Sequence, residues 1–270
     1  MLKFLQQPKQ KEMYYIPPEN FLYSAYKIKT KHSDGQKVLE GTATAFLLDI
    51  GSGIAWIITN RHVLDIDYKK STPKYKDFKL VSLELTGRKP DDTEYTIQIV
   101  PSTHAFFDNN YENDVAMILP KATLNDNQNF EWHFNLNHLA SEENFEHIIP
   151  YDVICYSGFP ETHDKFMRRP ILRSGRIASD PKFNYSWDEY NHGDCIAYEG
   201  FSSPGGSGSP VFATARGLPN MNNSRGAYLI GVNAGHIPGE FGHSGISYFY
   251  KSTVIYGIIE QNKLEEIKVK

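Results

Sequence analysis

Short runs of β-branched and aromatic residues recur along this 270-residue chain, and turn signals separate them. The first runs cover residues 21–28, 41–48 and 54–59, with turn-forming residues at 33–36 and 51–53. Short β-rich runs bounded by Gly, Asn, Asp and Ser are typical of strands. Because no helical patterns alternate with them, the chain is expected to be all-β, either a sandwich or a pair of barrels.

Short β-rich runs separated by turn residues continue through the rest of the chain. Residues 121–147, rich in Asn, Asp, Glu and His, interrupt them and suit a connector with a short helix at 141–147. Ser252 is expected to cap a C-terminal helix that contains Ile255 and Ile258. The remaining strands are expected at residues 79–85, 95–100, 115–119, 153–156, 167–177, 194–198, 210–214, 228–233 and 245–250.

The break near residue 130 divides the chain into two β-rich halves. Two barrels side by side leave a cleft between them, and clefts of this kind are where ligand sites usually lie. We expect an N-terminal arm (1–20), a first β-barrel (21–130), a connector (131–150), a second β-barrel with a C-terminal helix (151–262) and a tail (263–270).

Composition narrows the class of protein. With 28 basic and 32 acidic residues, the net charge of −4 does not favour nucleic acid or an anionic membrane as a partner. Cys155 and Cys195 allow one disulfide but no disulfide framework, so a reducing compartment is tolerated. No apolar run approaches the roughly 18 residues of a membrane span, and the N-terminus lacks a signal-peptide pattern. A soluble, cytoplasmic protein is expected, or a secreted one if a leader has been removed.

Residues 201–212 have the most unusual composition in the chain, with three Gly, four Ser and two Pro ahead of an apolar run. One interpretation is a flexible linker. The other is a tight turn in which Ser207 is a nucleophile. Gly205 and Gly206 would then let the backbone amides of Gly205 and Ser207 converge as an oxyanion hole.

A serine nucleophile needs an imidazole to take its proton and a carboxylate to orient that imidazole. His62 follows an apolar run, and Asp114 directly precedes another, so both are expected at strand ends facing the cleft. The plainer alternatives are that His62 is an ordinary surface or core histidine, and that Asp114 is a turn residue. A weak cation site over residues 108–114 is disfavoured because the acidic spacing matches no calcium loop.

Three segments together resemble the active-site motifs of the chymotrypsin-fold serine peptidases. They are Thr-Asn-Arg-His-Val at 59–63, Asn-Asp-Val-Ala at 113–116 and Gly-Gly-Ser-Gly-Ser-Pro-Val-Phe at 205–212, in that superfamily's order of His, Asp and Ser. Gly-Ser-Pro-Val-Phe after the serine, with residues 156–160 and 228–238, is most similar to the glutamyl endopeptidase branch, and next to HtrA-like peptidases. The resemblance covers about residues 40–262.

This resemblance implies two six-stranded antiparallel β-barrels with the active site in their cleft. It implies a serine endopeptidase that acts on a protein or peptide substrate and needs no metal or other cofactor. Ser207 would be acylated, His62 would shuttle the proton, and Asp114 would orient His62. The amides of Gly205 and Ser207 would stabilise the oxyanion.

The residue preference is harder to predict than the chemistry. Glutamyl endopeptidases have a His where this chain has Asn233, and trypsins have an acidic residue in place of Phe201. A small, polar or uncharged residue is therefore expected before the cleaved bond. His236 would either lie at the rim of the pocket or take over the role of the missing histidine. Five residues are expected to line the specificity pocket: Phe201, Ser202, Asn233, Ala234 and Gly235.

Other hydrolase classes fit the sequence poorly. The spacing Gly205-x-Ser207-x-Ser209 resembles the nucleophile elbow of α/β-hydrolases, but that fold needs a helix after the serine and an acid later in the chain. Here an apolar strand follows, and no Asp occurs after Ser207. There is no zinc motif. The rival hypothesis is a latent or inactive peptidase fold that serves as a binding module, or that needs a regulatory partner or ligand for activity.

Overall fold

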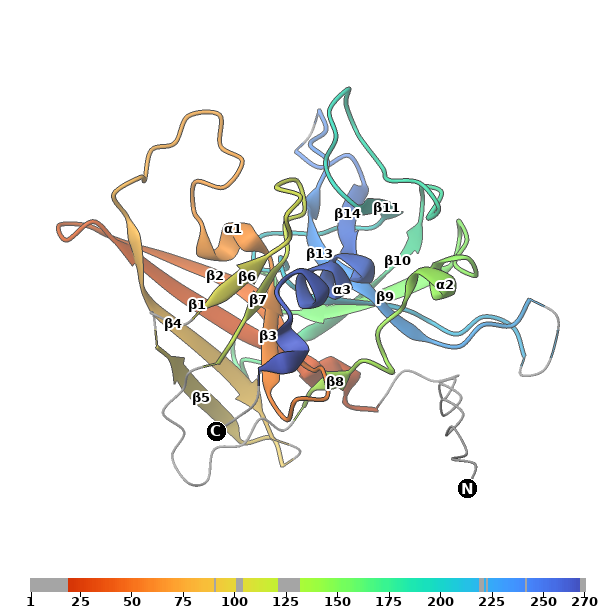
Figure 1. The fold of residues 1–270 in the computed structure, drawn as a ribbon, viewed down its shortest axis with the longest axis horizontal. Helices are drawn as coiled ribbons and strands as arrows, with labels where there is room; N and C mark the ends of the chain where they lie inside the picture. The colour runs from red at the N-terminus through yellow and green to blue at the C-terminus, as the bar shows by residue number, and fades with distance from the viewer. Residues whose placement is uncertain are drawn as a thin grey trace, which may run out of the picture.

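Strands are the main regular structure in the described residues, and they form a sheet from the first half of the chain and a barrel from the second (Figure 1). The expected N-terminal arm lies almost wholly outside the described residues, as does part of the expected connector. The structure, a computed structural model, describes residues 19–89, 91–100, 104–120, 132–218, 221, 223–240 and 242–267.

The first half forms an eight-stranded sheet in which the antiparallel strands follow the order β5-β4-β1-β2-β3-β7-β6, and the short β8 pairs with β2 in parallel. Six of these strands were expected. The other two, β6 and β8, have three and two residues, too few to show an alternating pattern. The strands are β1 (Ala25–Ser33), β2 (Val38–Asp49), β3 (Ala55–Thr59), β4 (Lys79–Arg88), β5 (Glu94–Ile99), β6 (Ala105–Phe107), β7 (Ala116–Ile118) and β8 (Phe134–Asn135).

The second half closes into a six-stranded antiparallel barrel, in the order β10-β11-β14-β13-β12-β9. This confirms the expected chymotrypsin-like architecture. The strand expected from residue 167 begins only at Ile171, directly after Pro170, whose ring nitrogen cannot donate to a sheet. The barrel strands are β9 (Val153–Gly158), β10 (Ile171–Ile177), β11 (Cys195–Glu199), β12 (Pro210–Ala213), β13 (Tyr228–His236) and β14 (Ile246–Lys251).

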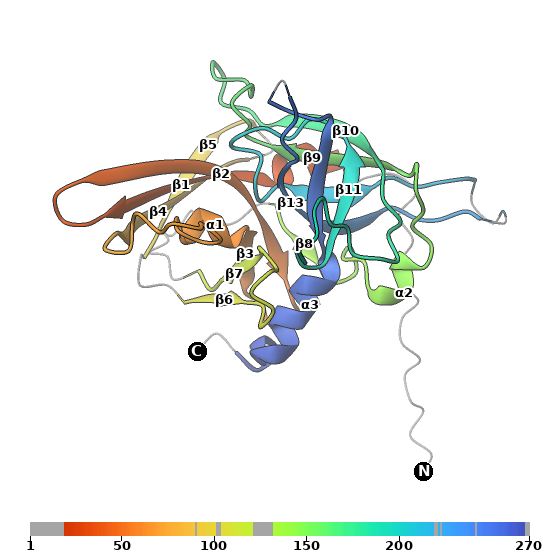
Figure 2. The ribbon, with the colours of Figure 1, turned by 90° about the horizontal axis from the view of Figure 1, so that it is seen from above.

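The expected C-terminal helix is present as α3 (Ser252–Gln261), which lies at the junction of the two halves (Figures 1 and 2). Ser252 does not cap it: Lys251 is the N-cap, and the Ser252 hydroxyl donates to the Ala140 carbonyl at 2.7 Å. Two short α-helices precede it, α1 (Arg61–Leu64) and α2 (Glu142–Phe145), and 3₁₀ turns occur at η1 (Glu19–Ser24) and η2 (Leu264–Glu266).

A shared apolar core joins the sheet to the barrel. Phe21 from η1 and Phe134 from β8 contact Phe212 of the barrel, with ring centroids 5.2 and 6.4 Å apart. Val254 and Ile258 of α3 belong to the same buried cluster. Separate apolar clusters fill the inside of the sheet and the inside of the barrel. The two halves are thus held in a fixed relation, which a site built from both of them requires.

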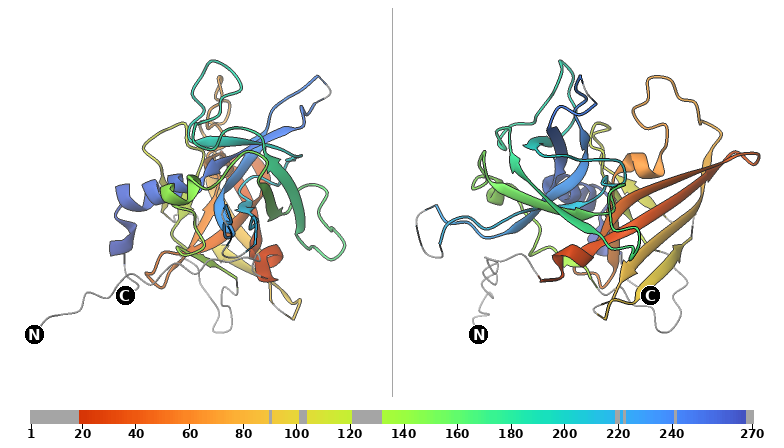
Figure 3. Two further views of the ribbon diagram at one scale, coloured as in Figure 1. Left: turned by 90° about the vertical axis from the view of Figure 1, so that its right-hand side faces the viewer. Right: turned by 180° about the vertical axis from the view of Figure 1, so that it is seen from behind.

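Two hairpins project from the body on opposite sides. The β1–β2 hairpin extends from the first half, and the β12–β13 hairpin extends from the barrel (Figures 2 and 3). None of the helices in the described ranges is long and apolar enough to cross a membrane.

The two cysteines do not form a disulfide; both are buried free thiols. Burial raises the pKa of Cys155 to about 12 and that of Cys195 to about 11. Both thiols therefore stay protonated and unreactive at neutral pH.

Candidate active site

The pairing of β3 with β7 brings His62 and Asp114 together. The two strands are antiparallel, with Thr59 opposite Ala116, so the residues just after β3 lie beside those just before β7. Asn60 reinforces this junction, because its buried amide donates to the Asp114 carbonyl at 2.6 Å. His62 itself lies in the one-turn helix α1 rather than in a continuing strand.

Asp114 holds the imidazole of His62 in one tautomer. Its Oδ2 lies 2.6 Å from Nδ1 of His62, and its Oδ1 accepts the backbone amide of His62 at 2.9 Å. Since an ionised carboxylate only accepts hydrogen bonds, Nδ1 carries the proton and Nε2 is left as the acceptor. An imidazole arranged in this way can take a proton at Nε2.

Two opposing effects act on the pKa of His62. Burial lowers it, because the charged form loses hydration, whereas the charge of Asp114 and the hydrogen bond to that carboxylate raise it. The net result is a pKa above the usual value of 6.5. The imidazolium that would form during proton transfer is therefore stabilised by Asp114.

The loop that carries Ser207 is a tight turn tied to the first half of the chain. The side chain of Thr44 in β2 donates to the Gly205 carbonyl, and its backbone amide donates to the Ser207 carbonyl, both at 2.8 Å. Gly208 has a φ of +85°, and a Cβ there would lie 2.0 Å from the Thr44 carbonyl oxygen. Only glycine fits this contact, so the segment is not a flexible linker.

Ser207, Gly205 and His62 line a single cavity of about 340 Å³ next to the β1–β2 hairpin. In this structure the Ser207 hydroxyl donates to the Ala234 carbonyl at 3.0 Å. Among the described residues, no hydrogen bond joins it to His62. Hydrogen bonds of this kind are often absent without substrate and form only when it is bound.

Two backbone amides of this loop are available to a ligand. The neighbouring amides of Gly206 and Gly208 donate to the carbonyls of Ser203 and Asn233, at 2.9 and 2.8 Å. The amides of Gly205 and Ser207 donate to no atom of the described residues. A pair of unengaged amides beside a serine hydroxyl can receive a negatively charged oxygen.

Residues 43–218, which include His62, Asp114 and Ser207, match the family described as the trypsin-like peptidase domain. The chain belongs to this family. Membership supports serine peptidase activity in general, while the glutamyl endopeptidase branch stays a prediction. No curated protein matches the sequence.

Three solved structures show how similar this trypsin-like domain is to known folds. The HtrA-type protease AlgW with tripeptide matches with 15% identity and a TM-score of 0.53, over 91% of this chain and 61% of that chain. Deg5 matches with 12% identity and a TM-score of 0.53, over 88% of each chain. Protease Anisep from Arthrobacter nicotinovorans matches with 13% identity and a TM-score of 0.56, over 90% and 96%. At such identities the similarity shows the fold, and this chain spans about 61% of the length of AlgW.

Two of the residues expected to line the specificity pocket, Asn233 and Phe201, differ in exposure and in their contacts. Asn233 is fully buried; its Oδ1 accepts the Tyr198 hydroxyl at 2.7 Å, and its Nδ2 donates to Ser202 Oγ at 2.9 Å and to the Gly206 carbonyl at 2.8 Å. Phe201 is 64% exposed, and its ring packs on His243. Asn233 thus braces the serine loop from behind, with every polar atom of its side chain engaged.

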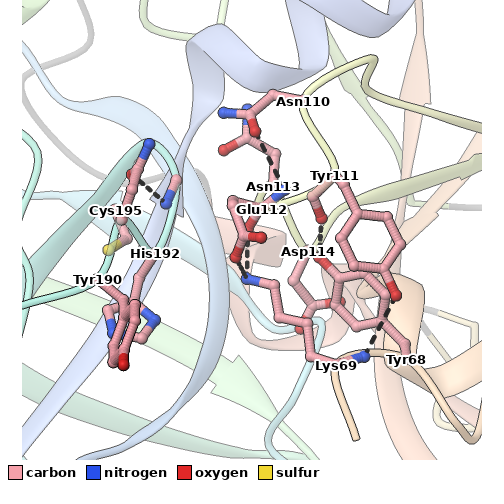
Figure 4. Close-up of polar contacts among 12 residues, drawn as sticks. Tyr68, Lys69, Asn110, Tyr111, Glu112, Asn113, Asp114, Tyr190, His192 and Cys195 are labelled. Atoms are coloured by element: carbon pink, nitrogen blue, oxygen red, sulfur yellow. Dashed lines mark hydrogen bonds and ion pairs between the residues drawn. The ribbon is translucent and has the colours of Figure 1, made fainter. Parts of the chain in front are cut away.

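A second cavity, of about 960 Å³, lies on the other side of His62 and was not expected from the sequence. Its wall comes from loops far apart in the chain, and Figure 4 shows Tyr190 and His192 across from Tyr68 and Tyr111. We call it the aromatic cavity because six aromatic side chains line it: Tyr68, Tyr111, Trp187, Tyr190, Tyr248 and Tyr250.

Asn113, also missed at the sequence level, fixes one wall of the aromatic cavity. Its buried side chain accepts the Asp194 amide at 2.8 Å and donates to the Asp194 carboxylate at 3.2 Å. This joins the segment before β7 to the segment before β11. In the residues that the structure describes, no group of three His, Cys, Asp or Glu side chains could hold a metal ion.

Proposed function

We propose that this chain is a serine endopeptidase with His62, Asp114 and Ser207 as its catalytic triad. The observation that carries the proposal is the pair of hydrogen bonds that His62 donates to the Asp114 carboxylate, next to a cavity that His62 shares with Ser207. One of these contacts, at Nδ1, fixes the tautomer of the imidazole, and the other holds the backbone of His62 in place. A base so prepared beside a serine is the arrangement that acyl transfer requires.

In the proposed reaction, Ser207 Oγ turns from the Ala234 carbonyl to His62 Nε2. The hydroxyl loses its proton to Nε2 as Oγ bonds to the substrate carbonyl carbon. The amides of Gly205 and Ser207 receive the resulting oxyanion. His62 then gives the proton to the leaving nitrogen, the C–N bond breaks, and water hydrolyses the acyl-enzyme by the same route.

The free edge of β13 supports a peptide as the substrate. β12 pairs with β13 only as far as Val232, whereas β14 pairs with it through His236. The backbone from Ala234 to His236 therefore has one unpaired edge next to Ser207. An extended peptide can add to such an edge as a further strand.

A second candidate function is a latent peptidase. The observation that favours it is the Ser207 hydroxyl, which is engaged by Ala234 and not by His62. A partner or ligand that breaks this contact would then be needed for turnover. The test below separates the two candidates.

Hydrolysis of fluorescently labelled casein tests the proposal. The wild-type chain is expected to release peptide fragments, and Ser207→Ala and His62→Ala are each expected to lower kcat by up to about 10⁶-fold. Equal hydrolysis by all three proteins would overturn it. No hydrolysis by the wild type, together with no reaction of Ser207 with an active-site reagent, would favour the latent form.

A further inference from the structure

We propose that the aromatic cavity binds a large apolar side chain of the substrate, from the residue just before the one whose carbonyl Ser207 attacks. The sequence preference of the enzyme would then arise there and not at the pocket of Ser202 and Asn233. This inference rests on the proposed peptidase function and names the substrate class of that site.

The register of a bound peptide follows from two contacts. The Ser207 hydroxyl contacts the Ala234 carbonyl, so the attacked residue lies next to Ala234. On an antiparallel added strand, the preceding residue then lies opposite Gly235. Residues directly opposite each other point to the same face of a sheet.

Gly235 shows which face this is. Its partner in the neighbouring strand β14 is Tyr248, and a Cβ on Gly235 would lie 3.1 Å from the Tyr248 hydroxyl oxygen. The substrate side chain opposite Gly235 thus points toward Tyr248, which lines the aromatic cavity. Because Gly235 has no side chain, the Tyr248 ring lies close over the strand at this point, with Cε1 and Cζ 3.4 Å from the position of a Cβ.

Two tyrosine hydroxyls of the cavity wall are bonded within the protein. The Tyr68 hydroxyl donates to the Tyr111 carbonyl at 2.6 Å, and the Tyr250 hydroxyl donates to the His192 carbonyl at 3.1 Å. The Trp187 ring packs on Tyr248, with centroids 4.7 Å apart. With these two hydroxyls engaged, the rings of Tyr68 and Tyr250 offer apolar surface to a ligand, as aromatic binding sites do.

The charges in the cavity disfavour a cationic side chain. Lys69 Nζ already lies there, 2.8 Å from the Glu112 carboxylate and 5.5 Å from the centroid of the Tyr68 ring (Figure 4). Lys70 also lines the cavity, and its positive charge acts on His62. Asp114 and Glu112 are the only carboxylates among the lining residues. Asp114 is paired with His62, and Glu112 is paired with Lys69. A substrate Lys or Arg would meet two cations and no unpaired anion.

The pocket beside Ser207 offers less discrimination. Asn233 has its amide oxygen and nitrogen bonded within the protein, and Ser202 Oγ is one of those partners. A substrate side chain there would have to compete for groups that are already satisfied.

A proteome-derived peptide library, cleaved by the wild-type enzyme and read by mass spectrometry, tests the inference without assuming any preference at the cleaved bond. Aligned cleavage sites should show Phe, Tyr, Leu or Met enriched in the residue before the attacked one, and Lys and Arg depleted. Two fluorogenic peptides that differ only there, Phe against Ala, should differ at least about tenfold in kcat/KM.

Trp187→Ala should reduce this tenfold ratio toward one, and Gly235→Val, whose Cβ would lie 3.1 Å from the Tyr248 hydroxyl and displace that part of the wall, should do the same. Phe183→Ala is the matched control, because Phe183 is 69% exposed and does not line the cavity. An unchanged ratio in both folded cavity variants overturns the inference, as does enrichment of Lys, Arg, Asp or Glu. Covalent labelling of Ser207 by a fluorophosphonate separates the cases: if labelling occurs but no preference is found, only this inference fails.

Discussion

Asp114 contacts His62 at two atoms, with Oδ2 2.6 Å from the imidazole Nδ1 and Oδ1 2.9 Å from the backbone amide. The backbone contact fixes the position of His62 within α1, and the side-chain contact sets its tautomer. In the proposed mechanism both must hold before Ser207 can be deprotonated.

Asp114→Asn should therefore lower kcat by about 10⁴-fold, because an amide cannot hold the proton on Nδ1 and stabilise the imidazolium. Steady-state hydrolysis of a peptide substrate measures the loss. Asp108→Asn is the matched control. Asp108 lies in the same loop and accepts a hydrogen bond from the Asn110 amide, not from His62, so this variant should keep near-normal activity. A loss below tenfold in Asp114→Asn would contradict the assigned role.

The pH dependence of kcat/KM should report the raised pKa of His62. Proton transfer from Ser207 needs the neutral imidazole, so activity should fall as the pH drops through a value above 6.5. The effect on stability has the opposite sense. The charged pair of His62 with Asp114 stabilises the fold fully at a pH below the unfolded-state pKa of His62. This stabilisation is lost as the pH rises through the folded-state pKa of His62. A pH–rate profile with its acidic limb below 6.5 would contradict the assignment.

Gly205→Ala should lower kcat by about 10²–10³-fold while leaving the chain folded. Gly205 has a φ of +86°, and a Cβ there would lie 2.4 Å from the Phe159 carbonyl oxygen, so the loop must shift. Gly51→Ala is the matched control, because Gly51 has a φ of +89° with no atom within 4 Å of a Cβ. Circular dichroism and peptide hydrolysis are the measurements. Equal activity in the two variants would count against the proposed oxyanion hole.

Asp152→Ala should lower the free energy of unfolding by about 3–5 kcal/mol, because it leaves the buried Arg225 guanidinium without its carboxylate. Urea unfolding measures the change. Glu40→Ala removes an exposed ion pair with Lys31 and should change stability little. A similar loss in both variants would show that the buried pair has no special role.

Local patterns predicted a β-rich chain in two halves and proposed His62, Asp114 and Ser207, and the resemblance to chymotrypsin-fold peptidases decided between the alternatives. Alternating and apolar runs mark the strands, and polar residues at their ends mark the cleft. The structure confirms the chymotrypsin-like fold and brings His62 and Asp114 together, while the catalytic roles remain proposals.

Contacts between distant segments could not be predicted in this way. Thr44 ties the serine loop to β2, and Asn233 braces it from within, but neither residue stands in a recognisable pattern. The aromatic cavity joins residues from 68 to 250, and no periodicity links them. Ser252 fits a capping pattern, yet its hydroxyl bonds to Ala140, because that carbonyl of the connector is within reach.

Reaction with a fluorophosphonate, read by intact mass and peptide mapping, tests the central claim most directly. The wild-type chain should gain one adduct, on Ser207, and His62→Ala should react far more slowly. Ser207→Ala should gain none. An adduct on another residue, or an unmodified wild-type protein under conditions where trypsin is fully labelled, would contradict the proposal that Ser207 is an activated nucleophile.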